Sequence, residues 1–198
     1  MERSLEQGHP NSADAAELFL YRPDANRFAG IGIDGEFDDV IGRIHKSDVP
    51  LLPTWRPIPF HWFSDNQPTR GDFPSLSNYW VVPVMSESAE TILNSRLHGR
   101  YEALPIYGGS TDRLSILHVM ETVDCLDLEK SEVERYSDGG VMRVLRYAVR
   151  REEVEGRHVF KLPQEHGRAL IIDQVFKDWI TDAGLTGLTF RKLAVQWL

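Results

Sequence analysis

The 198-residue chain has a single cysteine, Cys125, and no apolar run that could cross a bilayer. One cysteine excludes an internal disulfide and a multi-cysteine zinc site, so nothing indicates an oxidising compartment. The longest apolar run, Tyr79 to Met85, is far short of the about 20 residues that a membrane helix needs. The first residues include acids and a proline where a secretory signal requires a basic start and an apolar stretch. We expect a cytoplasmic protein without a membrane partner, in which Cys125 is a buried apolar side chain.

Motifs of nucleophilic and metal catalysis are also missing. No G-x-S-x-G motif is present, and the histidines are scattered without the short spacings of a zinc site. Asp124 and Asp127 flank Cys125 and would raise the pKa of its thiol, which makes it a poor nucleophile. The sequence therefore predicts no catalytic residue and no bound metal.

One glycine motif needs a separate interpretation. Residues 30–35 match the G-x-G-x-x-G pattern of a dinucleotide-binding turn. However, turn residues at 23–27 precede it where a strand is required, and Asp34 and Glu36 place negative charge where a pyrophosphate would bind. We expect a plain glycine turn and no nucleotide cofactor.

Basic side chains are in the minority, with 22 Lys and Arg against 30 Asp and Glu, for a net charge of −8. This balance disfavours nucleic acid as a partner and suits a basic protein. The negative charge is concentrated at 34–39, with four acids and no base, and at 121–138, with seven acids and two bases. Such segments can steer a basic partner, although acidic residues also serve solubility alone. The candidate partner-binding residues are Asp34, Glu36, Asp38, Asp39, Glu129, Glu132 and Glu134.

The composition, with 41% hydrophobic residues, is that of a globular protein with a buried core. We expect a flexible lead-in at 1–16 and a single α+β domain at 17–198, mainly an antiparallel sheet with a few packed helices. Strand-like runs occur at 17–21, 79–82, 101–107, 114–121, 141–150, 158–162, 169–172, 187–190 and 193–198.

Two helices are predicted from apolar residues at helical spacing. Ser86 would cap the first, at 87–97, and Asp173 the second, at 174–183, which Gly184 would end. We expect these helices to bury Ile92, Leu93, Leu97, Phe176, Trp179 and Ile180. The segment 50–74 is so rich in proline and aromatic residues that we expect neither a helix nor a central strand there. Its role as an irregular cover of the core is favoured over a ligand groove.

Several segments, in this order and spacing, resemble a known family. They include Gly71-Asp72-Phe73-Pro74-Ser75, Val123 to Ser131, Phe160-Lys161-Leu162, Ile172-Asp173 and Gly184 to Phe190. Over about residues 50–190 the chain is similar to the bacterial polymorphic-toxin immunity proteins of the immunity protein eleven family. This resemblance implies an α+β protein, encoded beside a toxin gene, that binds and neutralises that toxin and has no catalytic residues.

Two functions remain open from the sequence. The first is a non-enzymatic immunity protein that binds a cognate bacterial toxin, which the acidic balance suits. The alternative is a small-molecule enzyme whose site is formed by dispersed carboxylates and histidines, with residues 50–74 lining its pocket. A neighbouring toxin gene would favour the first function, and a place in a metabolic gene cluster would favour the second.

Overall fold

A computed structural model describes residues 17–33, 40, 44, 47–63, 69–77, 82–97, 100–108, 112–165 and 169–198. Among these residues the chain forms α-helices α2 (Glu87–Asn94), α3 (Arg151–Val154) and α4 (Gln174–Asp182), and short 3-10 helices η1 (Leu52–Thr54) and η2 (Pro163–Glu165). The strands are β1 (Leu18–Pro23), β2 (Ile31–Ile33), β3 (Ile58–Trp62), β4 (Val84–Ser86), β5 (Tyr101–Gly108), β6 (Asp112–Val119), β7 (Glu132–Arg135), β8 (Val141–Val149), β9 (Val159–Lys161), β10 (Leu170–Asp173), β11 (Leu188–Lys192) and β12 (Val195–Trp197). The fold is α+β, with more strand than helix.

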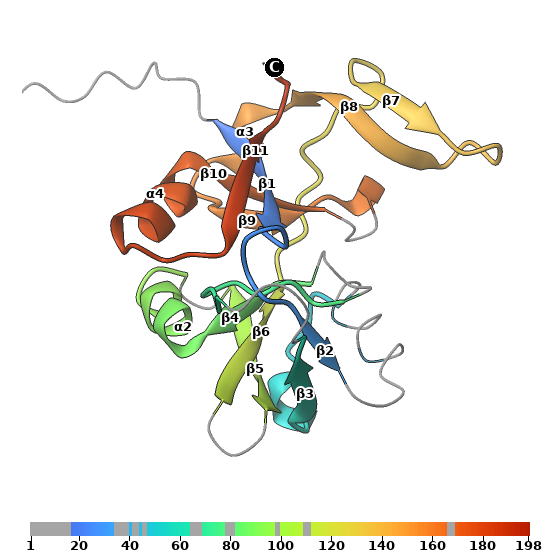
Figure 1. Ribbon diagram of the computed structural model, residues 1–198. Coiled ribbons are helices and arrows are strands. Elements are labelled where there is room, and N and C mark those ends of the chain that lie inside the picture. Colours follow the sequence, from blue (N-terminus) through green and yellow to red (C-terminus); the bar gives the residue numbers. More distant parts are fainter. Residues whose placement is uncertain are drawn as a thin grey trace, which may run out of the picture.

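The strands form three sheets, ordered β2-β3-β5-β6-β4, β11-β1-β10-β9 and β12-β8-β7. Pairing is antiparallel except between β3 and β5 and between β12 and β8, so the expectation of a mainly antiparallel arrangement is confirmed. In Figure 1 the five-stranded sheet and α2 lie below the four-stranded sheet and α4. The hairpin of β7 and β8 extends away from both.

The four-stranded sheet is buried on both faces, and the alternation of side chains along β1 shows how. Phe19 and Tyr21 point into a core shared with α2, α4 and β6. Leu18 and Leu20 point the other way, into a second core with β8 and the segment around Cys125. Because successive strand residues face opposite sides, a continuous apolar run is what a doubly covered strand requires. A third core fills the other side of the five-stranded sheet.

Both predicted helices are present with their predicted caps. The Ser86 hydroxyl accepts from the Ala89 amide, and the Asp173 carboxylate accepts from the Phe176 amide at 2.8 Å. Gly184, just beyond α4, has a φ of 68°. The helix α2 ends at Asn94, earlier than predicted. The predicted core residues Leu93, Leu97, Phe176 and Ile180 are buried, whereas Ile92 and Trp179 are only half-buried.

Two expectations about irregular segments are wrong. The segment 50–74 contains β3, which lies between β2 and β5 in the sheet although it includes Pro59. Proline is tolerated because β3 pairs with β5 only at 58–59 and with β2 only at 60–62, so neither ladder runs the full length of the strand.

The second correction concerns the glycine motif. Its residues 31–33 form strand β2 and not a turn. A Cβ at Gly32 would lie 2.7 Å from the ring of the exposed His61, so a larger residue there would have to displace that side chain. The last residues of the motif and the predicted strand residues 79–81 lie outside the described residues.

Candidate partner-binding surface

The structure describes three of the seven acidic residues singled out above. Asp34, Glu36, Asp38 and Asp39 lie outside the described residues. Glu129 is exposed in the turn before β7, and Glu132 and Glu134 lie on β7 itself. These three side chains therefore belong to the base and one strand of the projecting hairpin (Figure 1).

Asp127 organises the turn that carries Glu129. Its Oδ1 accepts from the amides of Glu129 and Lys130, both at 3.1 Å, and its carbonyl accepts from the Ser131 hydroxyl. The hydrogen bond from the Lys130 amide is the main reason why the pKa of Asp127 lies below its usual range. Asp127 thus has a structural role, as its short spacing to these amides predicts.

The two strands of the hairpin carry opposite charges. Arg143 donates two hydrogen bonds to Glu134, at 2.7 and 2.9 Å, and this contact lowers the pKa of Glu134. Glu132 lies opposite Arg146 in the register of the two strands. The acidic residues of β7 are therefore matched by arginines of β8, and no purely acidic face forms on this hairpin.

Two irregularities in the hairpin expose apolar side chains. In the pairing of β7 with β8, Met142 and Leu145 have no opposite residue and are the extra residues of two β-bulges. A bulge bends a strand and redirects a side chain. Met142 is 42% exposed and Leu145 is 39% exposed, which is high for apolar residues within a strand.

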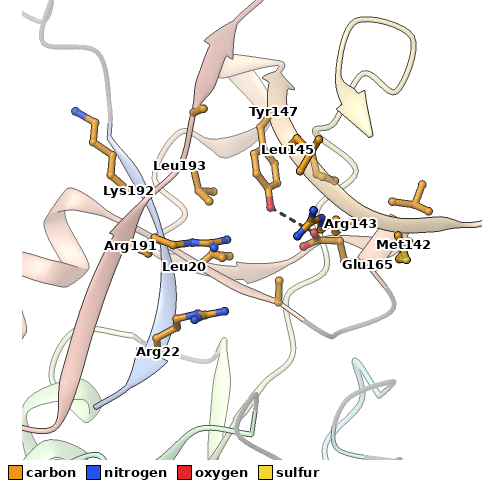
Figure 2. A pocket seen from close by; sticks show the side chains of 14 residues that line it. Leu20, Arg22, Met142, Arg143, Leu145, Tyr147, Glu165, Arg191, Lys192 and Leu193 are labelled. Atoms are coloured by element: carbon orange, nitrogen blue, oxygen red, sulfur yellow. Dashed lines mark hydrogen bonds between the residues drawn. The ribbon is translucent and has the colours of Figure 1, made fainter. Parts of the chain in front are cut away.

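Met142 and Leu145 line a groove of about 650 Å³ between β8 and the strands β1 and β11. We call it the β8 groove. Figure 2 shows Leu20, Leu193, Met142 and Leu145 around it, with charged side chains among them. The residues that line it are Leu20, Arg22, Val141, Met142, Arg143, Val144, Leu145, Tyr147, Glu165, Ala169, Arg191, Lys192, Leu193 and Ala194.

Glu165 from η2 is the acid of this groove. Its Oε1 accepts from the Tyr147 hydroxyl at 3.3 Å, the bond drawn in Figure 2. Its Oε2 is buried and has no hydrogen-bond partner among the described residues. Burial raises the pKa of Glu165, and the contacts with Tyr147, the Val144 amide and the charge of Arg191 only partly offset this effect.

Four basic residues line the groove with this acid, and Figure 2 shows Arg22 and Arg191 pointing into it and Lys192 pointing away. Arg22 comes from β1, Arg143 from β8, and Arg191 and Lys192 from β11. Arg143 is bonded to Glu134 and Lys192 to Glu17, while Arg191 interacts with Glu165 through its charge. Arg143 and Lys192 are thus paired with acids outside the groove, so its small excess of basic charge comes from Arg22 and Arg191 against Glu165. No local sequence pattern indicates this groove, because its residues come from strands far apart in the chain.

Two other groups that could be reactive, Cys125 and His118, are buried in the protein. Cys125 is 1% exposed, as expected, and burial raises the pKa of its thiol to about 11. His118 is fully buried, with its ring nitrogens 3.1 Å from Glu102 and 3.0 Å from the Ser47 carbonyl.

Within the described ranges, no three His, Cys, Asp or Glu side chains are grouped so that they could hold a metal ion. The helices described here are all too short or too polar to span a bilayer.

Comparison with known families gives one match. Residues 108–195 match the model of the Imm11 immunity protein family. This confirms the resemblance to immunity proteins over that segment, which contains all of β6 to β11, the β7–β8 hairpin and most of the β8 groove. A search of curated proteins finds no match.

Proposed function

We propose that this protein is a non-enzymatic immunity protein that binds a cognate toxin domain in the cytoplasm of the producing cell and neutralises it. The observation that carries the proposal is the match of residues 108–195 to an immunity protein family. An immunity protein must keep the free toxin negligible, which requires a dissociation constant of about 1 nM or below, or about −12 kcal/mol.

The β7–β8 hairpin is the proposed binding element, together with the acidic segment 34–39. The hairpin projects from the body of the protein and lies within the matched segment (Figure 1). It presents acidic side chains on β7 and exposed apolar side chains on β8. Because arginines of β8 lie opposite the acids of β7, the acidic charge that raises the association rate with a basic partner comes mainly from Glu129, Glu132 and the segment 34–39, and apolar contacts of β8 slow the release.

The first test is co-expression. The toxin domain encoded beside this gene is produced with and without this protein, and growth of the cells is measured. We expect growth only when the protein is present, and a stable complex on gel filtration. If no neighbouring toxin exists, or if the pair neither forms a complex nor restores growth, the proposal is wrong.

The second test concerns the acidic residues. The double variant Glu129→Lys with Glu132→Lys is preferable to one at Glu134, because Glu134 is bonded to Arg143 within the hairpin. We expect a slower association with the toxin domain and a weaker dependence of that rate on salt. A variant with Asp38→Lys and Asp39→Lys tests the other acidic segment in the same way.

The control for these variants is Asp178→Lys with Asp182→Lys, which makes the same change of charge on the exposed side of α4. Its association rate should stay close to that of the parent. If the hairpin variant and this control slow association equally, only the net charge matters and the acidic residues are not a specific contact.

A further inference from the structure

The β8 groove has a small excess of basic charge and largely apolar walls, and this combination limits what it can bind. Arg22 and Arg191 point into it (Figure 2), and Glu165 is the one acid among the described residues that line it. Between them lie Leu20, Met142, Leu145 and Leu193. A carboxylate is the group that such cations attract, and apolar side chains gain by burial against these leucines and Met142.

The shape of β8 favours an extended occupant. The strand β12 pairs with β8 only at 147–149, whereas β8 begins at Val141. On this side of β8, residues 141–146 therefore have no neighbouring strand among the described residues, and the contact of Glu165 from η2 with the Val144 amide occupies one position of this stretch. An extended segment can lie in this place in line with β12, as peptides do when they add to a sheet edge.

We propose that the β8 groove binds an extended segment of the toxin in which an acidic side chain is next to an apolar one. This inference rests on the proposed function, and names the partner's contacting segment. The carboxylate lies beside Arg191, and the apolar side chain packs against Met142 and Leu145. Nucleic acid does not suit the groove, because its walls are largely apolar and the protein carries a net charge of −8.

The two bulges of β8 determine which side chains line the groove. Met142 and Leu145 are three positions apart, so in a regular strand they would face opposite sides of β8. The two bulges let both side chains line the groove. Both side chains remain exposed in the unbound protein. Their burial by the partner would supply the apolar part of the affinity.

The test measures binding of the purified protein to the toxin domain encoded beside its gene. Arg191→Glu reverses the charge of the groove, and Met142→Asp removes its apolar wall. Each should raise the dissociation constant at least about tenfold. The matched controls are Arg113→Glu and Leu52→Asp, which change an exposed arginine and an exposed leucine associated with the five-stranded sheet. These controls should bind like the parent, and urea unfolding verifies that all four variants are folded.

A cross-link then identifies the occupant. A photo-reactive benzoylphenylalanine replaces Met142, and the cross-linked toxin peptide is read by mass spectrometry. We expect a peptide with Asp or Glu beside an apolar residue. Changing that acid to lysine should weaken binding to the parent but restore binding to the Arg191→Glu variant, because the two charges are then reversed together.

Each outcome has a clear meaning. If the parent binds the toxin and both groove variants bind equally well, the groove inference is wrong and the proposed function stands. If the parent itself does not bind, both are wrong. If sedimentation shows that the parent is a dimer and that Arg191→Glu dissociates it without affecting toxin binding, the groove is a contact between two copies, and the inference is again wrong.

Discussion

Asp72 holds Thr186 with two hydrogen bonds although 114 positions separate them in the chain. Its Oδ2 accepts from the Thr186 amide at 2.8 Å and from the Thr186 hydroxyl at 3.1 Å. Its Oδ1 accepts at 2.7 Å from the hydroxyl of Ser86, which caps α2. One carboxylate thus joins the start of α2 to the loop after α4. Asp72 and Thr186 both lie in segments named above for their resemblance to the immunity family, and here they have a structural role.

Replacing Asp72 with alanine should therefore destabilise the fold. The change removes acceptors from three donors in two parts of the chain, and we expect a loss of about 2–3 kcal/mol in the free energy of unfolding. Urea denaturation of parent and variant measures it. Asp182→Ala, at the exposed end of α4, is the control and should change stability by less than about 0.5 kcal/mol. Equal effects of the two changes would show that the contact with Thr186 contributes nothing.

The second prediction compares two aromatic residues of α4. Phe176 is fully buried in the core between the sheets, so Phe176→Ala should cost about 3–5 kcal/mol. Trp179 is half-buried, with its ring centroid 4.7 Å from that of His158 and 5.4 Å from the Arg96 guanidinium above it. Trp179→Ala should cost less, about 1–3 kcal/mol. Thermal or urea unfolding ranks the two, and a larger cost at Trp179 would contradict the burial seen here.

The two helices could be predicted because the residues that start them are neighbours in the chain. Ser86 and Asp173 each precede apolar residues at helical spacing, so both caps follow from neighbours in the chain. The strand β3 was missed because Pro59 argues against an interior strand, and only the split of its pairing between two neighbours makes it acceptable. The strand β7 was missed because its charges suggested a solvated segment.

The candidate surface was less accessible to sequence reasoning. Glu129, Glu132 and Glu134 were found because they are close together in the chain. Arg22 and Arg191 are distant in sequence and meet only through the pairing of β1 with β11. The contact between Glu134 and Arg143 also depends on the bulged register of the hairpin, which no local pattern indicates.

The third prediction concerns Glu102, which holds the segment 47–52 against β5 and β6. Its carboxylate accepts from the Leu51 amide at 2.7 Å and the Leu52 amide at 3.2 Å, and His118 lies 3.1 Å away. Burial alone would raise the pKa of Glu102, but these contacts together lower it. Its stabilising effect is therefore present above the ordinary pKa of a glutamate and is lost as the pH falls through the lowered value.

Replacing Glu102 with glutamine tests this dependence. The variant should be less stable than the parent near neutral pH, and the difference should shrink as the pH falls below about 4. Urea unfolding at a series of pH values measures both proteins. Glu129→Gln, an exposed residue, serves as the control and should follow the parent throughout. A difference that stays constant with pH would mean that the charge of Glu102 does not stabilise the fold.

Glu165 should show the opposite pH dependence. Burial raises its pKa above the ordinary value, and the hydrogen bonds from Tyr147 and Val144 do not fully compensate. The folded protein therefore binds this proton more tightly than the unfolded chain does, so the free energy of unfolding falls as the pH rises from the ordinary glutamate pKa through the raised one.

Glu165→Gln keeps an acceptor for Tyr147 and removes the charge. We expect this variant to be more stable than the parent at about pH 7 and similar to it at about pH 4. The exposed Glu155→Gln is the matched control, and urea unfolding at both pH values measures all three proteins. If Glu165→Gln is destabilising at about pH 7, the charge of Arg191 stabilises the carboxylate more than burial penalises it, and the acid of the β8 groove is a net stabiliser of the fold.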